Sequence, residues 1–335
     1  MNIIIPMAGM GKRMRPHTLT TPKPLLPIAG KSIVHRLVED IVRTADGKVG
    51  EIAFIIAPSF GQEVEEHLVE IATQLGAKGK IYYQKEALGT AHAILSASAA
   101  LKGNVFIAFA DTLFKATFSI DKEKDAIIWT QKVEDPSAFG VVKLNKDNQI
   151  EAFVEKPQEF VSDQAIIGVY YFKDGENLKK ELQRLLDKDI KQKGEYQITD
   201  AMDHMLKNGM KFYTDQVDEW LDCGNKDATV STNSRVLNIK QDSEELVSTT
   251  VKLENSVIIP PCYIGKNVQI TNSVIGPNVS LEEGVMVEDS RITESIVQAH
   301  SIVKNARLHN SLLGKNVIYT DKSVEISLGD FSTQL

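Results

Sequence analysis

The sequence predicts an α/β protein in which a Rossmann-like, mixed but mainly parallel sheet is followed by a short parallel β-helix. Two patterns carry this prediction. Apolar strand-like runs alternate with amphipathic helix-like runs over residues 3–110, and a short motif recurs at positions 255, 272 and 289. Alternating strands and helices imply right-handed crossovers and a parallel sheet, whereas a short repeat that turns one aliphatic inward per side builds a solenoid.

The composition describes an acidic protein with few cysteines. The 335 residues carry a formal net charge of −7, and the hydrophobic (42%) and charged (25%) fractions are ordinary for a globular chain. A net negative charge argues against nonspecific nucleic-acid binding. Only Cys223 and Cys262 occur, without a CxxC pair, and no stretch is typical of a signal peptide or a membrane span. We therefore expect a cytoplasmic protein without disulfides, with no nucleic-acid partner and no membrane partner.

The N-terminal stretch, residues 2–27, joins a short strand to a basic loop that contains glycines. Ile3–Ile5 is typical of a buried strand, and Gly9 and Gly11 allow the next turn to bring backbone N–H groups to an anion. The first acidic residue is Glu39, although the overall composition would place about five acids before it. The cations left without neutralisation in this loop are Lys12, Arg13, Arg15 and Lys23. The stretch therefore predicts a local anion site on an acidic protein.

The first half of the chain is expected to gather several loops at one edge of the sheet. Ser32 is typical of the N-cap of a helix that ends at Thr44. The later strands are expected at 51–57, 80–84 and 104–110, and the later helices at 62–75 and 90–101. Ligands bind beyond the carboxyl ends of parallel strands. The loops at 8–23, 84–90 and 111–113 are therefore predicted to meet in one cleft.

The second half changes character twice. Strands joined by turns at 126–172 are expected to extend the sheet, and helices follow at 177–190, at 198–207 and up to about residue 240; the polar stretch 241–248 is predicted to be a linker. The repeats NSVI, NSVI and DSRI begin at 255, 272 and 289, and ESIV and NSLL begin at 294 and 310. Steps of 17 and then 16 residues predict about four triangular coils. The chain is thus expected to consist of domains 1–242 and 249–335.

The basic loop resembles the signature of the sugar-1-phosphate nucleotidylyltransferases. The resemblance rests on two spaced blocks, AGxGxRMxPxT from Ala8 and PKPxxP from Pro22, and its departure is Lys12, where the family has threonine. A Walker A loop does not fit, because Pro6 stands where its first glycine is needed and Arg13 replaces its Ser or Thr. The resemblance covers nearly the whole chain. It implies a glycosyltransferase-A-like sheet followed by a left-handed β-helix of hexapeptide repeats.

The same resemblance implies roles for four charged residues. Arg13 would stabilise the departing pyrophosphate, and Lys23 the α-phosphate or the sugar phosphate. Asp111 follows an apolar strand and Asp222 lies in a Trp-x-Asp-x-Gly segment, and they resemble the family's metal pair. Carboxylates suit Mg²⁺, which is the implied cofactor. Taken without the resemblance, the cations would be solvated surface charges and each aspartate a turn or cap residue.

The remaining positions concern substrate binding. Gln84 matches the family's base-reading segment, because an amide offers a donor and an acceptor to a base edge; Gly89 lets the base approach the backbone, and Thr90 is expected to N-cap the next helix. Glu155 would accept from sugar hydroxyls and Lys156 would meet the sugar phosphate, although a salt-bridged surface pair is the alternative. The implied substrate-binding set also includes Ala8, Gly9, Gly11 and Gly140, and residues 195–200 resemble a further family segment near the sugar.

These residues predict an enzyme that transfers a nucleotidyl group from an NTP to a hexose 1-phosphate, giving an NDP-sugar and pyrophosphate. Glucose 1-phosphate with dTTP is the first expectation, and mannose 1-phosphate with GTP is the alternative. A non-catalytic regulatory subunit that binds a nucleotide sugar is an alternative of another class, but such a subunit could lose its cations and carboxylates, and here all are present. The flat face and open last coil of the β-helix predict a homo-oligomer.

Overall fold

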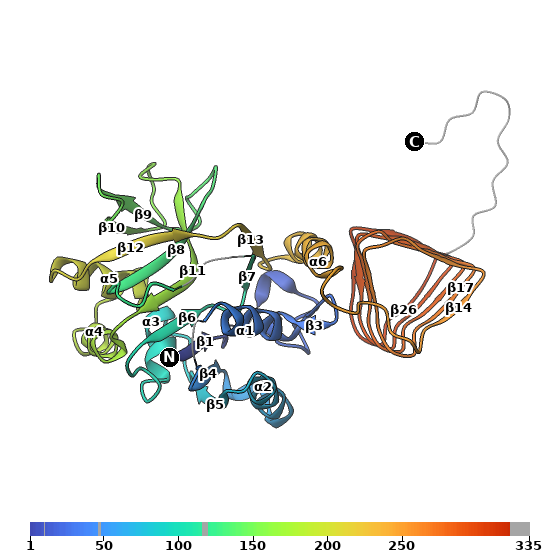
Figure 1. Cartoon of the computed structure of the whole chain (residues 1–335), viewed down its shortest axis with the longest axis horizontal. Helices are drawn as coiled ribbons and strands as arrows, with labels where there is room; N and C mark the ends of the chain where they lie inside the picture. The colour runs from blue at the N-terminus through green and yellow to red at the C-terminus, as the bar shows by residue number, and fades with distance from the viewer. Residues whose placement is uncertain (10, 46–47, 116–119, 322–335) are drawn as a thin grey trace. The chain divides into compact units, whose positions relative to one another are not determined.

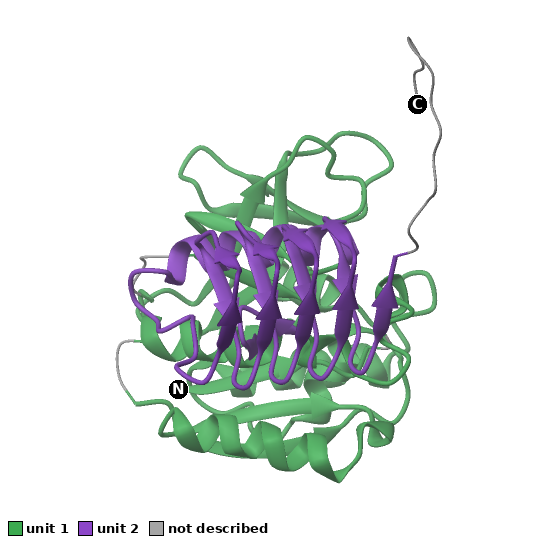
Figure 2. Ribbon diagram, turned by 90° about the vertical axis from the view of Figure 1, so that its right-hand side faces the viewer, with its two compact units in different colours: residues 1–26, 32–224 green, residues 27–31, 225–335 purple. Residues whose placement is uncertain are grey.

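The computed structural model describes residues 1–321 except 10, 46–47 and 116–119, so the last part of the expected β-helix domain, 322–335, lies outside the described residues. The chain divides into two compact units. The first unit comprises residues 1–26 and 32–224, and the second comprises residues 27–31 and 225–335 (Figure 1, Figure 2). The division into domains 1–242 and 249–335, which the sequence suggested, stays a prediction. No described helix combines the length and apolarity that crossing a bilayer requires.

The first unit is built on a nine-stranded mixed sheet. β1 (Asn2–Pro6) pairs in parallel with β4 (Glu51–Ile56) and β6 (Val105–Ala108), and β4 pairs in parallel with β5 (Lys78–Tyr83). β11 (Gln164–Phe172) runs antiparallel to β6. The other strands of this sheet are β8 (Ala126–Lys132), β9 (Gly140–Leu144), β10 (Ile150–Glu155) and β12 (Phe212–Gln216). The predicted mixed, mainly parallel α/β sheet is confirmed.

Local sequence explains the central elements. Ile3, Ile4 and Ile5 of β1 are fully buried, as an apolar run inside a parallel sheet should be. α1 (Ile33–Thr44) begins after Ser32, whose side chain accepts a hydrogen bond from the His35 N–H, so the predicted cap is confirmed. The other helices of the unit are α2 (Gln62–Gln74), α3 (Thr90–Ser96), α4 (Gly175–Asp187) and α5 (Ile198–Lys207), with short 3₁₀ turns η1 (Lys12–Met14), η2 (Lys23–Leu25) and η3 (Pro58–Phe60).

One predicted cap is wrong. Gly89, not Thr90, occupies the N-cap of α3, and no side chain caps that helix. The Thr90 hydroxyl accepts from the Ile198 N–H at 3.0 Å and donates to Gln197 Oε1 at 3.0 Å. A partner far away in sequence therefore takes the hydroxyl that a local cap would have used. The helix also ends at Ser96 rather than near residue 101.

The second unit contains β2 (Pro27–Ile28), the first residue of β3 (Lys31–Ser32), α6 (Lys226–Lys240) and a stack of coils. The coils form three parallel sheets in register, an arrangement consistent with a left-handed β-helix (Figure 2). Their strands are β14 (Lys252–Glu254), β15 (Val257–Ile258), β16 (Cys262–Ile264), β17 (Gln269–Thr271), β18 (Val274–Ile275), β19 (Val279–Leu281), β20 (Met286–Glu288), β21 (Arg291–Thr293), β22 (Ser295–Val297), β23 (Ile302–Lys304), β24 (Arg307–His309), β25 (Leu312–Leu313) and β26 (Ile318–Thr320).

The predicted repeat matches the coil spacing. Ile270 pairs with Val287 and Val287 with Val303, and all three side chains are buried on the coil axis. The predicted linker is partly wrong, because Val247 forms a parallel bridge with Ile264. The backbone on either side of Val247 also bonds to Ile264, so the end of the expected linker already follows the first coil.

Candidate active site

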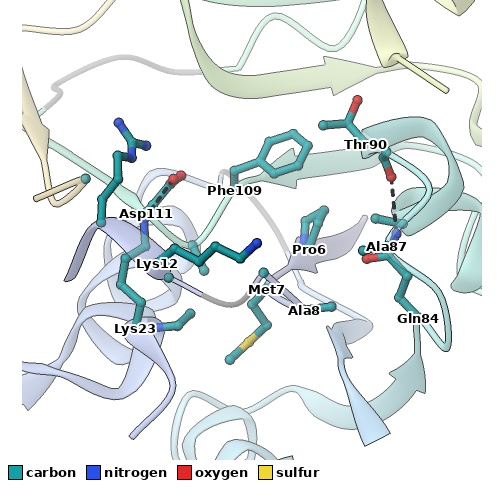
Figure 3. Close-up of a pocket in the computed structure, with 18 of the residues that line it drawn as sticks. Pro6, Met7, Ala8, Lys12, Lys23, Gln84, Ala87, Thr90, Phe109 and Asp111 are labelled. Carbon is teal, nitrogen blue, oxygen red and sulfur yellow. Dashed lines mark hydrogen bonds and ion pairs between the residues drawn. The ribbon is translucent and has the colours of Figure 1, made fainter. Parts of the chain in front are cut away.

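A pocket of about 390 Å³ opens at the carboxyl ends of the parallel strands of the first unit (Figure 3). Its size is within the usual range for a small-molecule site. The loops predicted to meet there do meet. The lining residues are Pro6, Met7, Ala8, Gly9, Gly11, Lys12, Arg13, Lys23, Pro24, Gln84, Ala87, Gly89, Thr90, Ala93, Phe109, Ala110, Asp111, Glu195 and Gly224.

The basic loop is folded tightly around Gly11. Gly11 has φ +56°, and a Cβ there would meet Lys23 Cβ at 3.0 Å and Thr18 Cγ2 at 3.1 Å, so glycine is needed for both conformation and space. The Thr18 hydroxyl donates to the Gly11 carbonyl at 2.8 Å. Met14 anchors η1 in the core with 1% exposure. At Gly9, by contrast, a Cβ would meet no heavy atom within 4 Å, so this position borders open space in the pocket.

Strand pairing brings the two predicted metal ligands together. Asp111 directly precedes β7 (Thr112–Lys115), and Asp222 ends β13 (Glu219–Asp222); these strands pair antiparallel, with Asp222 opposite Thr112. The Cys223 N–H donates to the Asp111 carbonyl at 3.1 Å. Lys23 Nζ lies 2.9 Å from Asp111 Oδ2, and both residues are drawn in the close-up of the pocket (Figure 3). A cation of the basic loop and a carboxylate from a distant strand thus share one wall of the pocket.

Asp222 is in a strongly charged environment. Burial raises its pKa above the ordinary aspartate value and Asp111 raises it further, whereas the Gly224 N–H, Lys23 and Arg13 lower it. The Gly224 N–H donates to Asp222 Oδ1 at 3.0 Å. A Cβ on Gly224 would meet Arg13 Nη2 at 3.5 Å, so the guanidinium lies beside this turn.

The donor set formed by Asp111 and Asp222 fits Mg²⁺. This ion takes oxygen ligands and is usually held by one or two carboxylates, with waters and substrate phosphates completing its shell. Among the residues that the structure describes, no group of three or more His, Cys, Asp or Glu side chains is placed to hold a metal. Asp111 lines the pocket, whereas Asp222 is not among its lining residues and lies next to it, where its strand pairs with the residue after Asp111.

The opposite side of the pocket is formed by the loop after β5. Gln84 is 9% exposed, and its Nε2 donates to the Gly89 carbonyl at 3.2 Å. Gly89 has φ +111°, and a Cβ there would lie 2.4 Å from the Tyr196 carbonyl oxygen, so only glycine fits. Figure 3 shows Gln84 beside Ala87 and Thr90, across the pocket from Lys23 and Asp111.

Three predicted site residues form a second cluster that does not line this pocket. Gly140 and Glu155 face each other across the β9–β10 ladder, and a Cβ on Gly140 would lie 3.0 Å from Glu155 Oε2. Lys156 has a positive φ of 46°, and its Nζ lies 3.7 Å from Glu155 Oε1. That ion pair also satisfies the alternative interpretation of a surface pair.

A buried phenol links the two clusters electrostatically. Burial raises the pKa of Tyr170, and both Glu155 and Asp111 raise it further. The Glu155 carboxylate and the Asp111 carboxylate thus act on the same buried group. The Tyr170 phenol therefore lies within electrostatic reach of a carboxylate from the predicted sugar side and of one from the predicted metal side.

Several lining residues were missed by the sequence interpretation. Phe109 lies two residues before Asp111, and Pro24 follows Lys23 inside the PKP block. Their closeness in sequence to predicted site residues is the feature that could have identified them. Glu195 belongs to a segment noted for its resemblance but not selected as a site residue. Lys12, the departure from the family pattern, also lines the pocket and adds a cation to it.

The fold and the site define a nucleotidyltransferase. The chain belongs to the nucleotidyl transferase family, whose profile matches residues 2–239, and it is a sugar-1-phosphate nucleotidyltransferase. It is 28% identical over 363 residues to a glucose-1-phosphate thymidylyltransferase of Streptomyces antibioticus, covering 99% of this chain and 98% of that protein. It is 31% identical to a mannose-1-phosphate guanyltransferase of Neurospora crassa, covering 96% and 93% of the two chains. The crystal structure of an apo UDP-glucose pyrophosphorylase shares the fold, with a TM-score of 0.59 and 22% identity over 71% of this chain and 98% of that chain.

Proposed function

We propose that this enzyme joins a hexose 1-phosphate to a nucleoside triphosphate with Mg²⁺ as cofactor, and that dTTP and glucose 1-phosphate are the preferred pair. The observation that carries the proposal is the Lys23–Asp111 ion pair, 2.9 Å long, at a pocket wall beside Asp222 and Arg13. Such a site neutralises two polyanions and offers oxygen ligands at one place, which is what nucleotidyl transfer between phosphates requires.

In the proposed reaction, an oxygen of the sugar phosphate attacks the α-phosphorus of the triphosphate. The new P–O bond forms as the bond to the bridging oxygen breaks, and that oxygen leaves with its electron pair as part of pyrophosphate. Lys23 neutralises charge on the α-phosphate or the sugar phosphate, and Arg13 neutralises the leaving pyrophosphate. Asp111 and Asp222 would hold Mg²⁺, which would add to the neutralisation of phosphate charge when bound.

On the substrate side, the proposal places the base against Gln84 and Gly89 and the triphosphate along Ala8, Gly9 and Gly11, with Thr90 at the base end. Gly140, Glu155 and Lys156 would receive the sugar. The open space around Gly9 supports the phosphate position. Mannose 1-phosphate with GTP stays the second candidate, because a thymidylyltransferase and a guanyltransferase both match nearly the full length of the chain.

The deciding experiment is release of pyrophosphate, measured across dTTP, UTP, GTP, ATP and CTP, each combined with glucose 1-phosphate and mannose 1-phosphate. We expect turnover that EDTA abolishes and Mg²⁺ restores, with the highest kcat/KM for dTTP and glucose 1-phosphate. Asp111→Asn, which keeps an oxygen for Lys23, should lower kcat by about 100-fold or more. No turnover with any pair would instead support the non-catalytic binding role.

A further inference from the structure

Asn233 lies on α6 and is fully buried, although it is polar. Its Oδ1 accepts two hydrogen bonds, from the Ala29 N–H at 2.9 Å and from the Ser280 hydroxyl at 2.8 Å. Among the described residues, its Nδ2 is buried and finds no hydrogen-bond partner. An unpaired buried amide group is costly, so an apolar side chain would suit this place better if packing were the only requirement. The hydrogen bonds to Oδ1 are therefore the reason for a polar residue here.

The first of these hydrogen bonds holds the turn of a short hairpin. The strands β2 and β3 pair with each other, and between them Ala29 and Gly30 have φ of +48° and +83°. A two-residue hairpin turn requires this left-handed region, which alanine rarely adopts. Ala29 is 1% exposed, and its N–H is the group that Asn233 binds. Asn233 thus stabilises a backbone conformation that alanine alone does not favour.

The hairpin is continuous with the 3₁₀ turn η2, which carries Lys23. The Leu26 N–H donates to the Lys23 carbonyl at 3.0 Å, and the Leu26 carbonyl accepts from the Ile33 N–H at 3.0 Å, where the hairpin ends. Leu26 is 1% exposed. Pro24 and Pro27 have fixed φ angles, so the connection between η2 and the hairpin contains few soft torsions. A displacement of the hairpin turn would therefore be passed on to η2.

The placement of η2 matters because of the charge on Lys23. Lys23 Nζ donates to Asp111 Oδ2 at 2.9 Å, and Lys23 as a whole is 9% exposed. A charge-assisted hydrogen bond weakens steeply as its distance and angle depart from the ideal values. A shift of the Lys23 backbone would therefore lengthen this contact or move the ammonium group along the wall of the pocket.

We propose that Asn233 is a positioning residue for Lys23. By accepting from the Ala29 N–H it holds the hairpin turn, and the hairpin in turn holds η2 with the Lys23 ammonium group at the wall of the pocket. Asn233 acts through the backbone between positions 23 and 29, and not by contact with a substrate. This inference rests on the proposed function, because it takes Lys23 to bind a phosphate. It gives α6, which carries none of the predicted site residues, a part in phosphate binding.

The first test replaces Asn233 by leucine, which has a similar volume but cannot accept a hydrogen bond. Hydrogen exchange of the Leu25 and Leu26 amides, whose N–H groups bond within η2, reports whether the change reaches that turn. We expect both amides to exchange about tenfold faster in Asn233→Leu than in the wild type. Asn233→Asp keeps an acceptor oxygen and should retain most of the protection. If the leucine variant does not fold, Asn233→Ala, which also lacks the acceptor, takes its place.

Asn238→Leu is the matched control. Asn238 lies on the same helix, and its Nδ2 donates to Asn278 Oδ1 at 2.9 Å, so it also joins α6 to the coils. Its replacement should leave the exchange of Leu25 and Leu26 within about twofold of the wild type, even if the melting temperature falls as much as in Asn233→Leu. Equal acceleration in the two variants would show a general loss of stability and overturn the proposal.

The second test measures the affinity for inorganic tripolyphosphate by calorimetry in EDTA. Asn233→Leu should weaken binding by about fivefold, and Lys23→Met by about tenfold or more. In the Lys23→Met background, Asn233→Leu should cause no further loss, because the ammonium group that it places is gone. Equal losses with and without Lys23, or unchanged exchange in η2, would overturn the proposal. Because binding needs no turnover, a protein that shows this coupling but releases no pyrophosphate would refute the proposed function and leave the inference standing.

Discussion

Asp222 shows how a single residue of the site opposes the stability of the fold. Burial and the neighbouring Asp111 carboxylate raise its pKa, so the folded protein holds the Asp222 proton more tightly than the unfolded chain does. The ionised carboxylate therefore lowers stability once the pH exceeds the folded pKa. This loss disappears as the pH falls below the ordinary aspartate value, where both states are protonated. A cation between the two carboxylates would remove the same penalty.

We therefore predict that Asp222→Asn is more thermally stable than the wild type at pH 7–8 in EDTA, but loses Mg²⁺-dependent turnover. The amide oxygen can still accept from the Gly224 N–H, so the turn is retained. The gain in melting temperature should shrink as the pH is lowered toward the ordinary aspartate pKa, and Mg²⁺ should stabilise the wild type only. Scanning calorimetry measures both effects. Asp147→Asn, on an exposed turn, is the control for the charge change, and an unstable but fully active Asp222→Asn would contradict this account.

At the scale of the elements, the sequence predicted single helices and their caps better than it predicted which strands pair. The helix Ile33–Thr44 and its Ser32 cap follow from side chains close together in sequence, and so they were predicted correctly. The ladder that sets Asp222 opposite Thr112 joins strands far apart in the chain, and strand register has no local signature. Asp111 and Asp222 were nevertheless expected at one site, from the resemblance and not from strand pattern. The Thr90 cap failed for the related reason that a distant segment took its hydroxyl.

The repeated Asn-Ser-x-x motif of the β-helix has a structural explanation. The first residue adopts a positive φ at each corner, as in Asn272 and Asp289. The serine after it builds a ladder: Ser273 Oγ accepts from the Ser290 N–H, and Ser290 Oγ accepts from the buried Ala306 N–H at 3.0 Å. Each hydroxyl also donates to a carbonyl of its own coil. The motif therefore satisfies backbone groups that the coil buries.

Ser290→Ala should consequently destabilise the β-helix more than its small change in volume suggests. It leaves the Ala306 N–H without its acceptor, and a buried unsatisfied donor costs about 1–3 kcal/mol. The free energy of unfolding of the second unit, followed by urea denaturation, should fall by that amount. Ser311→Ala removes a hydroxyl that donates at an exposed position and should cost about 0.5 kcal/mol or less. Equal effects of the two substitutions would argue against the ladder.

At the scale of the whole molecule, the second unit is not made of C-terminal residues alone. Residues 27–31, which directly follow the basic loop in sequence, belong to it, and the Ala29 N–H donates to Asn233 Oδ1 at 2.9 Å. The phenol ring of Tyr263 occupies the space that a Cβ on Gly30 would need. No local pattern distinguished this short segment from the loop before it, which is why the sequence interpretation assigned it to the first domain.

The β-helix also carries an apolar strip that supports the proposed homo-oligomer. Met286, Ile302 and Ile318 are paired in register in β20, β23 and β26. Val287 and Val303, which follow the first two, are buried inside the coil, so the column that the three side chains form faces outward. Met286 is 40% exposed and Ile318 75%. An apolar column on a flat parallel face is self-complementary when a second copy meets it about a two-fold axis.

We predict that sedimentation equilibrium shows more than one copy of the chain per particle, and that Met286→Lys combined with Ile318→Lys returns it to a monomer. Two charges on the column would have to be desolvated in the contact, which an apolar interface does not tolerate. Because both side chains point away from the coil axis, the substitutions should leave the melting temperature of the isolated protomer nearly unchanged. Val257→Lys, at an exposed apolar position on a different sheet of the same β-helix, is the matched control and should keep the assembly intact. A wild type that sediments as a monomer at micromolar concentration would contradict the proposed assembly, and dissociation by Val257→Lys alone would move the interface to the other sheet.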